Sequence, residues 1–262
     1  MSVASVTSLI PRGAPPGAVR SASELSTPSQ AVGQRVLPVH AELANLLPHR
    51  GLRRGSTVVV RGSTTVLLAL LALATSRGSW AAVVGMPDLG LLAASELGVA
   101  VHRLALVPDP GAQLGSVVAA LLDGVDLVVV AGAGLARAGP SGAGLARRLS
   151  ARARHRGAVL IPFGQFPFGQ WPGADLELSC TRTRWSGLGV GFGTDPGAEA
   201  GAESAVGHGH LAECELALSV RGRGVAARPT YGGLSLSGGG GLGPVPPTPE
   251  ENSDLDLGVK AG

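Results

Sequence analysis

Four consecutive residues, Gly62 to Thr65, have the types and the position of a phosphate-binding turn. They follow a buried-strand pattern, Thr57 to Arg61, and precede an apolar helical run, as in a loop of the form GxxxxGK[ST]. Such a loop needs four residues between its glycines, so that several backbone N–H groups can surround the phosphates. Here the loop is shortened to Gly62, Ser63, Thr64 and Thr65.

This shortening removes most of the groups that would hold a nucleotide. Thr64 or Thr65 could supply a magnesium-binding hydroxyl, but the chain's only lysine, Lys260, is far from the turn. Without the loop and the lysine, several charge-assisted hydrogen bonds are lost, each worth about 1.5–3 kcal/mol. Since about 1.4 kcal/mol corresponds to a tenfold change in affinity, nucleotide binding falls by several orders of magnitude. The residues favour an ordinary strand and buried helix over a nucleotide site, and we expect no cofactor.

The chain has the composition of a globular α/β protein. Of its 262 residues, 45% are hydrophobic and only 3% aromatic, so the core must consist mainly of Val, Leu and Ala. Apolar strand patterns alternate with helical patterns, which predicts a mainly parallel sheet with helices on both faces. We expect these strands at Thr57 to Arg61, Trp80 to Gly85, His102 to Val107, Val125 to Val130 and Ala158 to Phe163. Alternating apolar residues at Leu176 to Cys180 and Cys214 to Val220 predict two antiparallel edge strands.

Three regions are expected along the chain. Residues 1–35, rich in Ser, Pro, Ala and Gly, predict a flexible leader, residues 36–230 the core domain, and residues 231–262 a disordered acidic tail rich in Gly and Pro. The longest apolar run, Val66 to Thr75, is too short for a membrane span, and no secretory signal is evident. We therefore expect a cytoplasmic protein that does not bind membranes. Cys180 and Cys214 have no metal-ligand spacing, so we expect two reduced thiols and no metal.

The order of elements and several local strings resemble the core of the RecA recombinase family, a P-loop NTPase fold. The resemblance runs from about residue 36 to 230. It is carried by GLRRGSTVVVRG at 51–62, ELGV at 96–99 with HRLALV at 102–107, LDGVDLVVV at 122–130 and AVLIPFGQ at 158–165. The last two strings are similar to the Walker B strand and to the strand that ends in the glutamine switch.

Compared residue by residue, this chain lacks most of that family's catalytic groups. The resemblance places the catalytic glutamate at Met86 or Pro87, and neither side chain can orient a water molecule. The Walker B aspartate falls at Ala131, while Gln165 keeps the switch position. The resemblance therefore implies an ATPase-inactive RecA-like domain. The alternative is a residual or nucleotide-gated ATPase that regulates recombination, in which Asp88 replaces the lost glutamate.

Two strings, GSTTVLLALLA at 62–72 and GMPDLG at 85–90, resemble the ImuA-prime family of actinobacterial RecA-like proteins. That resemblance implies a non-catalytic accessory role in SOS-induced, mutagenic translesion synthesis after DNA damage. The implied partner is ImuB, an inert Y-family polymerase homologue, with RecA and DNA as further contacts and recruitment to the nucleoid. We expect no filament, because the leader lacks the helix and strand with which RecA subunits grip one another.

Basic and apolar residues outside the vestigial turn are the candidates for partner or DNA contacts. Arg148, Arg152 and Arg156 share one helix face at i, i+4 spacing, which could follow a phosphate backbone or be a solvated outer face. A second group, in a Gly/Pro-rich loop, could anchor a partner, stack on a base or pack against the sheet edge. Its members are Phe166, Phe168 and Trp171, with Phe163 beside them.

In the acidic tail, Leu255 and Leu257 could become ordered when the tail binds a partner, and the string around them is weakly similar to a peptide that binds the sliding clamp. Alternatively, the acidic tail only keeps the protein in solution. Trp185 is expected to pack in the core or at a sheet edge.

Overall fold

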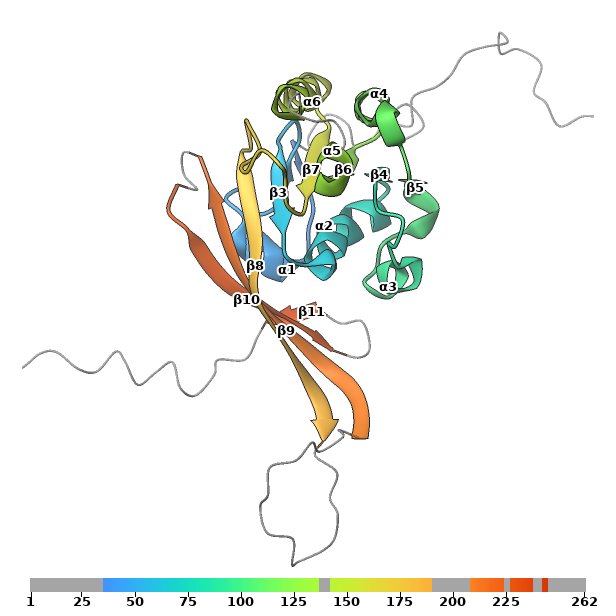
Figure 1. Ribbon diagram of the computed structural model, residues 1–262. Coiled ribbons are helices and arrows are strands. Elements are labelled where there is room, and N and C mark those ends of the chain that lie inside the picture. The colour runs from blue at the N-terminus through green and yellow to red at the C-terminus, as the bar shows by residue number, and fades with distance from the viewer. Residues whose placement is uncertain (1–34, 137–141, 190–207, 224–226, 238–241, 245–262) are drawn as a thin grey trace, which may run out of the picture.

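The structure, a computed structural model, describes residues 35–136, 142–189, 208–223, 227–237 and 242–244 (Figure 1). In chain order, its larger elements are β1 (Val36–Leu37), α1 (Ala41–Leu46), β2 (Leu52–Arg53), β3 (Val58–Arg61), α2 (Thr64–Ser76), β4 (Ala81–Val84), α3 (Leu91–Glu96), β5 (Leu104–Val107), α4 (Leu114–Gly124), β6 (Leu127–Ala131), α5 (Gly132–Ala136), α6 (Gly142–Arg156), β7 (Val159–Phe163), β8 (Leu176–Gly189), β9 (His208–Gly222), β10 (Thr230–Ser237) and β11 (Leu242–Pro244).

Nine strands form the main sheet, in the order β11-β10-β9-β8-β3-β7-β6-β4-β5. The six strands from β8 to β5 in this order are parallel, and β9, β10 and β11 extend the sheet antiparallel on one side. The predicted fold class is confirmed: a mainly parallel sheet has helices on both faces and antiparallel strands at one edge. Each parallel strand expected from the apolar runs is present, with ends shifted by one or two residues.

The two faces of the sheet bury two separate apolar cores. On one face, Val58 and Val60 of β3 pack in a cluster with residues of α1, α2 and α3. On the other face, Val59 packs in a cluster with residues of α4 and α6. Because successive strand residues point to opposite faces, strands that are buried on both faces must be apolar throughout, as β4 and β6 are. In Figure 1, the helices α4 and α6 lie on one side of the sheet and α1, α2 and α3 on the other.

The structure corrects three expectations about the carboxyl-terminal half. β8 is not an antiparallel edge strand, because it pairs in parallel with β3 over four residue pairs, from Val58 with Leu176 to Arg61 with Ser179. The core domain does not end at residue 230, since β10 pairs with β9 and β11 with β10. The acidic tail was predicted to start at 231, but residues 231–237 and 242–244 belong to β10 and β11. The rest of this tail, residues 238–241 and 245–262, lies outside the described residues, as does the leader up to residue 34.

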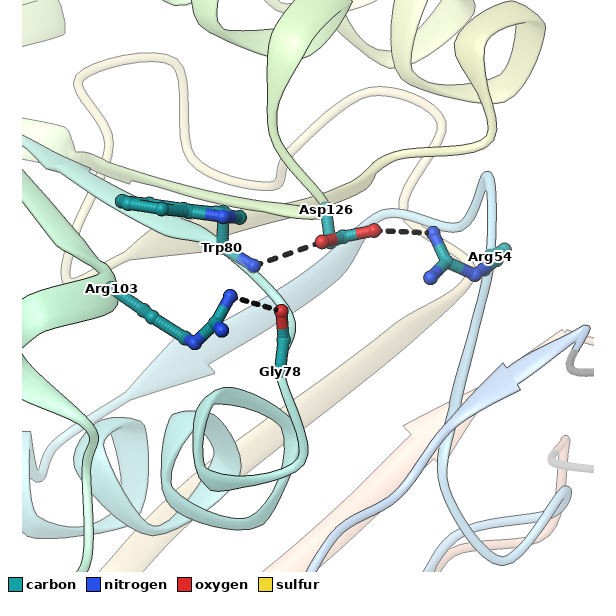
Figure 2. A network of polar contacts seen from close by, with 5 residues as sticks. All are labelled: Arg54, Gly78, Trp80, Arg103 and Asp126. Atoms are coloured by element: carbon teal, nitrogen blue, oxygen red, sulfur yellow. Dashed lines mark hydrogen bonds and ion pairs between the residues drawn. The ribbon is translucent and has the colours of Figure 1, made fainter. Parts of the chain in front are cut away.

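A polar network joins the segments just before β4 and β6 (Figure 2). It lies at the amino-terminal ends of these strands, whereas the Gly62–Thr65 turn follows the carboxyl-terminal end of β3. The buried carboxylate of Asp126 accepts a hydrogen bond from the backbone N–H of Trp80 at 2.9 Å and one from Arg54 at 2.8 Å. Arg103 lies over the ring of Trp80, 5.6 Å from its centre, and donates to the carbonyl of Gly78 at 2.8 Å. All these groups are engaged within the protein, so the network is structural.

Candidate functional site

The turn after β3 has no room for a phosphate loop. Gly62 has a φ of +85°, and Ser63 already caps α2, which begins at Thr64. The Ser63 hydroxyl accepts a hydrogen bond from the backbone N–H of Val66 at 3.4 Å, so it satisfies one of the free N–H groups of the first helical turn. The strand therefore passes into the helix through two residues, and no extended loop of N–H groups exists at this position.

The cation nearest to this turn in the sequence, Arg61, is fully engaged by other groups. Its Nε donates to Glu177 of β8 at 2.9 Å, and its two terminal nitrogens donate to the carbonyls of Gly164 and Gly169 at 3.3 Å and 3.2 Å. The guanidinium carbon also lies 5.2 Å from the centre of the Phe166 ring. Arg61 thus holds the segment between β7 and β8 against β3, and its charge is neutralised by Glu177.

A cavity of about 610 Å³ lies beside the turn, at the carboxyl ends of four neighbouring parallel strands. It is lined by Thr64, Gly85, Met86, Pro87, Asp88, Leu89, Pro108, Asp109, Pro110, Gly111, Ala131, Gly132, Ala133, Gly134, Phe163, Gly164 and Gln165. These residues end or follow β4, β5, β6 and β7, except for Thr64 at the start of α2. Among the described residues of the lining, Asp88 and Asp109 supply the only formal charges, and both are negative.

The cavity brings together the positions that the RecA resemblance singled out. Thr64, Met86, Ala131 and Gln165 come from four separate segments, and all four line it. Asp88, the alternative catalytic carboxylate, lies there as well. Ala131 offers only a methyl group at the position where the resemblance places a magnesium-holding carboxylate. The structure thus brings these positions together at one cavity, with apolar side chains at Met86 and Ala131 and a carboxylate at Asp88.

The arginines of α6 are mostly engaged in ion pairs. Arg152 donates through Nε to Asp123 of α4 at 2.8 Å and forms a second contact through its terminal nitrogen, while Arg156 Nε lies 3.0 Å from the same carboxylate. The hydrogen bond from Arg152 holds the pKa of Asp123 below its ordinary value. Two of the three arginines that could follow a phosphate backbone are thus paired with Asp123 on the outer face of the helix, and the contact with DNA stays a prediction. Arg148 is exposed and has no ion pair within the described chain.

The aromatic group is a packed cluster and not an exposed platform. Phe166 and Trp171 are only 7% and 3% exposed, and their ring centres lie 5.1 Å apart. Phe168 lies 5.7 Å from Phe166, and the indole N–H of Trp171 donates to the hydroxyl of Ser150 on α6 at 2.9 Å. Of the alternatives open from the sequence, packing against the sheet and α6 is the one observed for Phe166 and Trp171, with Phe168 half-buried beside them.

The remaining candidate residues lie in the antiparallel part of the sheet or in the tail. Trp185 was expected to pack in the core or at a sheet edge, but on β8 it is 53% exposed. Tyr231 on β10 is 69% exposed. Leu255 and Leu257 lie outside the described residues. Within the described part of the chain, no helix is both long and apolar enough to cross a membrane. The same residues contain no group of three or more His, Cys, Asp or Glu side chains that could hold a metal ion.

Comparison with known proteins gives matches to the domain that carries the cavity. A family described as the MT3502 N-terminal domain matches residues 45–173. The uncharacterized protein Rv3395c of Mycobacterium tuberculosis (strain ATCC 25618 / H37Rv) is 41% identical over 127 residues, which cover 48% of this chain and 57% of that protein. The match thus spans little more than half the length of the mycobacterial relative. Among solved structures, the KaiC-like protein PH0186 of Pyrococcus horikoshii OT3 is 12% identical with a TM-score of 0.49, over 82% of this chain and 100% of that one.

The family match covers only part of the described structure. It begins within α1 and ends at Gly173, shortly before β8. It includes the shortened turn, every residue that lines the cavity and the aromatic cluster. The antiparallel strands β9, β10 and β11 lie outside it.

Proposed function

We propose that this protein is a RecA-like accessory protein of the translesion synthesis machinery, which binds an ImuB-like partner as a scaffold and does not hydrolyse ATP. The observation that carries the non-catalytic part is the direct passage from Gly62 into the capped helix α2. Neither a phosphate loop nor a lysine exists there to hold a triphosphate. The partner and the pathway are supported by the resemblance of the strings at 62–72 and 85–90 to the ImuA-prime family.

The electrostatics of the cavity support the same proposal. A nucleoside triphosphate carries several negative charges, and phosphate sites compensate them with Lys, Arg, backbone N–H groups and Mg²⁺. The described residues of the lining include no Lys, Arg or His, and they add the carboxylates of Asp88 and Asp109. Arg61, the nearest cation in sequence to the turn, is paired with Glu177. A triphosphate at this position would meet repulsion in place of the usual charge compensation.

Isothermal titration calorimetry of the full chain with Mg-ATP tests the absence of a nucleotide site, with an active RecA protein in the same buffer as the positive control. We expect no binding heat at millimolar ATP. A dissociation constant in the micromolar range would overturn the non-catalytic part of the proposal. Steady-state hydrolysis that is abolished by Asp88→Ala would instead establish the residual ATPase.

The scaffold role is tested separately by co-purification. The full chain and an ImuB-like protein from the same genome are expressed together, and the complex is isolated by affinity and size-exclusion chromatography. We expect a stable complex that survives without added nucleotide. If the two proteins separate completely, with each one folded by circular dichroism, the assigned partner is wrong.

A further inference from the structure

The cavity exists because the chain leaves two neighbouring strands toward opposite faces of the sheet. After β4 the chain runs to α3, whose Ala94 belongs to one core together with Leu97 just after the helix. After β6 it runs through α5 to α6, whose Ala146 and Leu149 belong to the other core. β4 and β6 pair directly with each other. The loops that follow them therefore diverge and leave a crevice outside the carboxyl ends of the strands, which is where open α/β sheets bind ligands.

The walls of this cavity are largely apolar and in part tightly packed. Met86, Leu89 and Phe163 line it together with prolines and glycines. The glycines pack tightly: a Cβ on Gly132 would stand 1.9 Å from the carbonyl oxygen of Gln165, and one on Gly134 would stand 2.4 Å from a methyl of Leu114. Such close packing leaves the loops little room to collapse into the space. A volume of about 610 Å³ is in the range of ligand pockets and can hold more than one side chain.

Within the described lining of the cavity, the charged side chains are exposed to solvent and both are negative. Asp88 and Asp109 both line it and are both solvent-exposed. Within the described part of the chain, neither carboxylate forms an ion pair or a side-chain hydrogen bond. A ligand that matches this arrangement has an apolar group that enters the cavity and a cationic group that remains at the wet rim. A peptide with an apolar side chain next to an Arg or Lys has this chemistry.

We propose that this cavity is the docking site for a partner protein segment in which an apolar side chain is flanked by a basic residue. The apolar side chain enters between Met86 and Phe163, and the basic residue faces Asp88 and Asp109. The proposal rests on the scaffold function above and adds to it the surface and the chemistry of the partner. The chain's own tail has one apolar residue beside a basic one, Val259 and Lys260, but four carboxylates precede this pair, at Glu250, Glu251, Asp254 and Asp256. These carry the same charge as the rim, so a segment of a partner protein matches the rim better than the tail does.

A titration with dipeptide probes tests the chemistry of the cavity directly. Ac-Phe-Arg-NH2, Ac-Phe-Glu-NH2 and Ac-Ala-Arg-NH2 are added separately to the isotope-labelled full chain, and amide chemical shifts are followed. We expect Ac-Phe-Arg-NH2 to bind most tightly and to shift the amides of Asp88, Gly132 and Gly164. The other two probes should bind at least about fivefold more weakly, since each lacks one of the two contacts. Equal binding of the three probes, or shifts elsewhere on the protein, would overturn the proposal.

Two matched variants then connect the cavity to the partner. Ala133→Arg places a cation in the cavity lining, whereas Ala120→Arg adds the same side chain at an exposed position of α4, outside the lining. Ala133→Arg should weaken Ac-Phe-Arg-NH2 binding and the partner complex at least tenfold, and Ala120→Arg should leave both unchanged. Asp88→Asn and Asp109→Asn should each weaken the peptide about two- to fivefold, the size of an exposed ion pair.

The failures of the two proposals are distinguishable. If the wild-type chain binds the ImuB-like partner and Ala133→Arg binds it equally well, the cavity is not the docking site, although the scaffold function stands. If the wild-type chain does not bind that partner at all, the scaffold function fails in its present form. In that case the dipeptide titration alone decides whether the cavity takes an apolar side chain with a basic flank.

Discussion

Arg61 and Glu177 form an ion pair across two neighbouring parallel strands, with Arg61 Nε 2.9 Å from Glu177 Oε1. The side chains are 23% and 32% exposed, so the pair is partly shielded from water. The same guanidinium donates to the carbonyls of Gly164 and Gly169 and lies over Phe166. A cation at the end of β3, beside the shortened turn, therefore has a structural function, with each of its three nitrogens bonded within the protein.

Replacement of Arg61 should destabilise the domain. Arg61→Ala removes hydrogen bonds to one carboxylate and two carbonyls, and we expect it to lower the free energy of unfolding by about 2–4 kcal/mol. Arg61→Lys should be intermediate, because an ammonium group keeps the charge but cannot reach three acceptors with the planar geometry of a guanidinium. Urea unfolding followed by circular dichroism measures both variants. Equal stability of Arg61→Ala and wild type would show that the ion pair contributes nothing.

The close approach of Gly62 to β8 can be tested by comparing an alanine substitution there with one at Gly164, which has the same backbone conformation. Gly62 and Gly164 have φ values of +85° and +90°. A Cβ on Gly62 would stand 2.6 Å from the carbonyl oxygen of Cys180, whereas a Cβ on Gly164 would meet nothing within 4 Å. Gly164→Ala should cost about 1–2 kcal/mol for the left-handed conformation alone. Gly62→Ala should cost at least about 1 kcal/mol more because of the collision with the backbone. Thermal unfolding of the pair measures the difference, and equal midpoints would refute the close approach.

Trp171 should contribute to stability and not to nucleic-acid binding. Trp171→Phe removes the hydrogen bond to Ser150 and leaves a buried hydroxyl without that partner, so we expect a loss of about 1–3 kcal/mol in the free energy of unfolding. Trp185→Phe is the matched control, since Trp185 is 53% exposed, and it should change stability by less than about 0.5 kcal/mol. If Trp171→Phe left stability unchanged but weakened single-stranded DNA binding, the buried packing described here would not be its role.

The ion pairs of Asp123 predict a pH dependence of stability. Its pKa is lowered chiefly by the hydrogen bond from Arg152; burial opposes this shift, and the charges of Arg152 and Arg156 lower the pKa further. A carboxyl group whose pKa is lower in the folded state stabilises the fold above its unfolded pKa of about 3.9, and this contribution is lost as the pH falls through the folded pKa.

Asp123→Asn should therefore lower the unfolding midpoint at pH 7, and its difference from the wild type should shrink as the pH falls below about 3.9. Asp109→Asn, which changes a carboxylate without an ion pair in the described chain, is the control and should have little effect on the midpoint. A constant difference between Asp123→Asn and the wild type from pH 7 to pH 3 would contradict this assignment.

The sequence determined the elements that depend on local patterns. Strands β4 and β6 are continuous apolar runs, because both of their faces are covered, and Gly62 with Ser63 marks the passage into α2. The absence of a lysine and of a long loop at this turn is likewise a property of the sequence. Local patterns could not give the direction of β8, since a strand with one buried face alternates in the same way in a parallel and an antiparallel pair. β10 was missed because its Gly and Ser residues indicate a loop, although Leu234 is buried.

Only the tertiary structure decided which side chains are free to act. Asp123 and Arg152 are 29 positions apart, and no local pattern shows that two of the three expected arginines are neutralised. Trp171 and Ser150 meet in the same way, through the packing of a loop onto α6. The cavity needs five segments that are separated along the chain, and they converge because parallel strands place their carboxyl ends at one edge of the sheet. Residue types set the chemistry that is available here, and the strand order set where that chemistry is brought together.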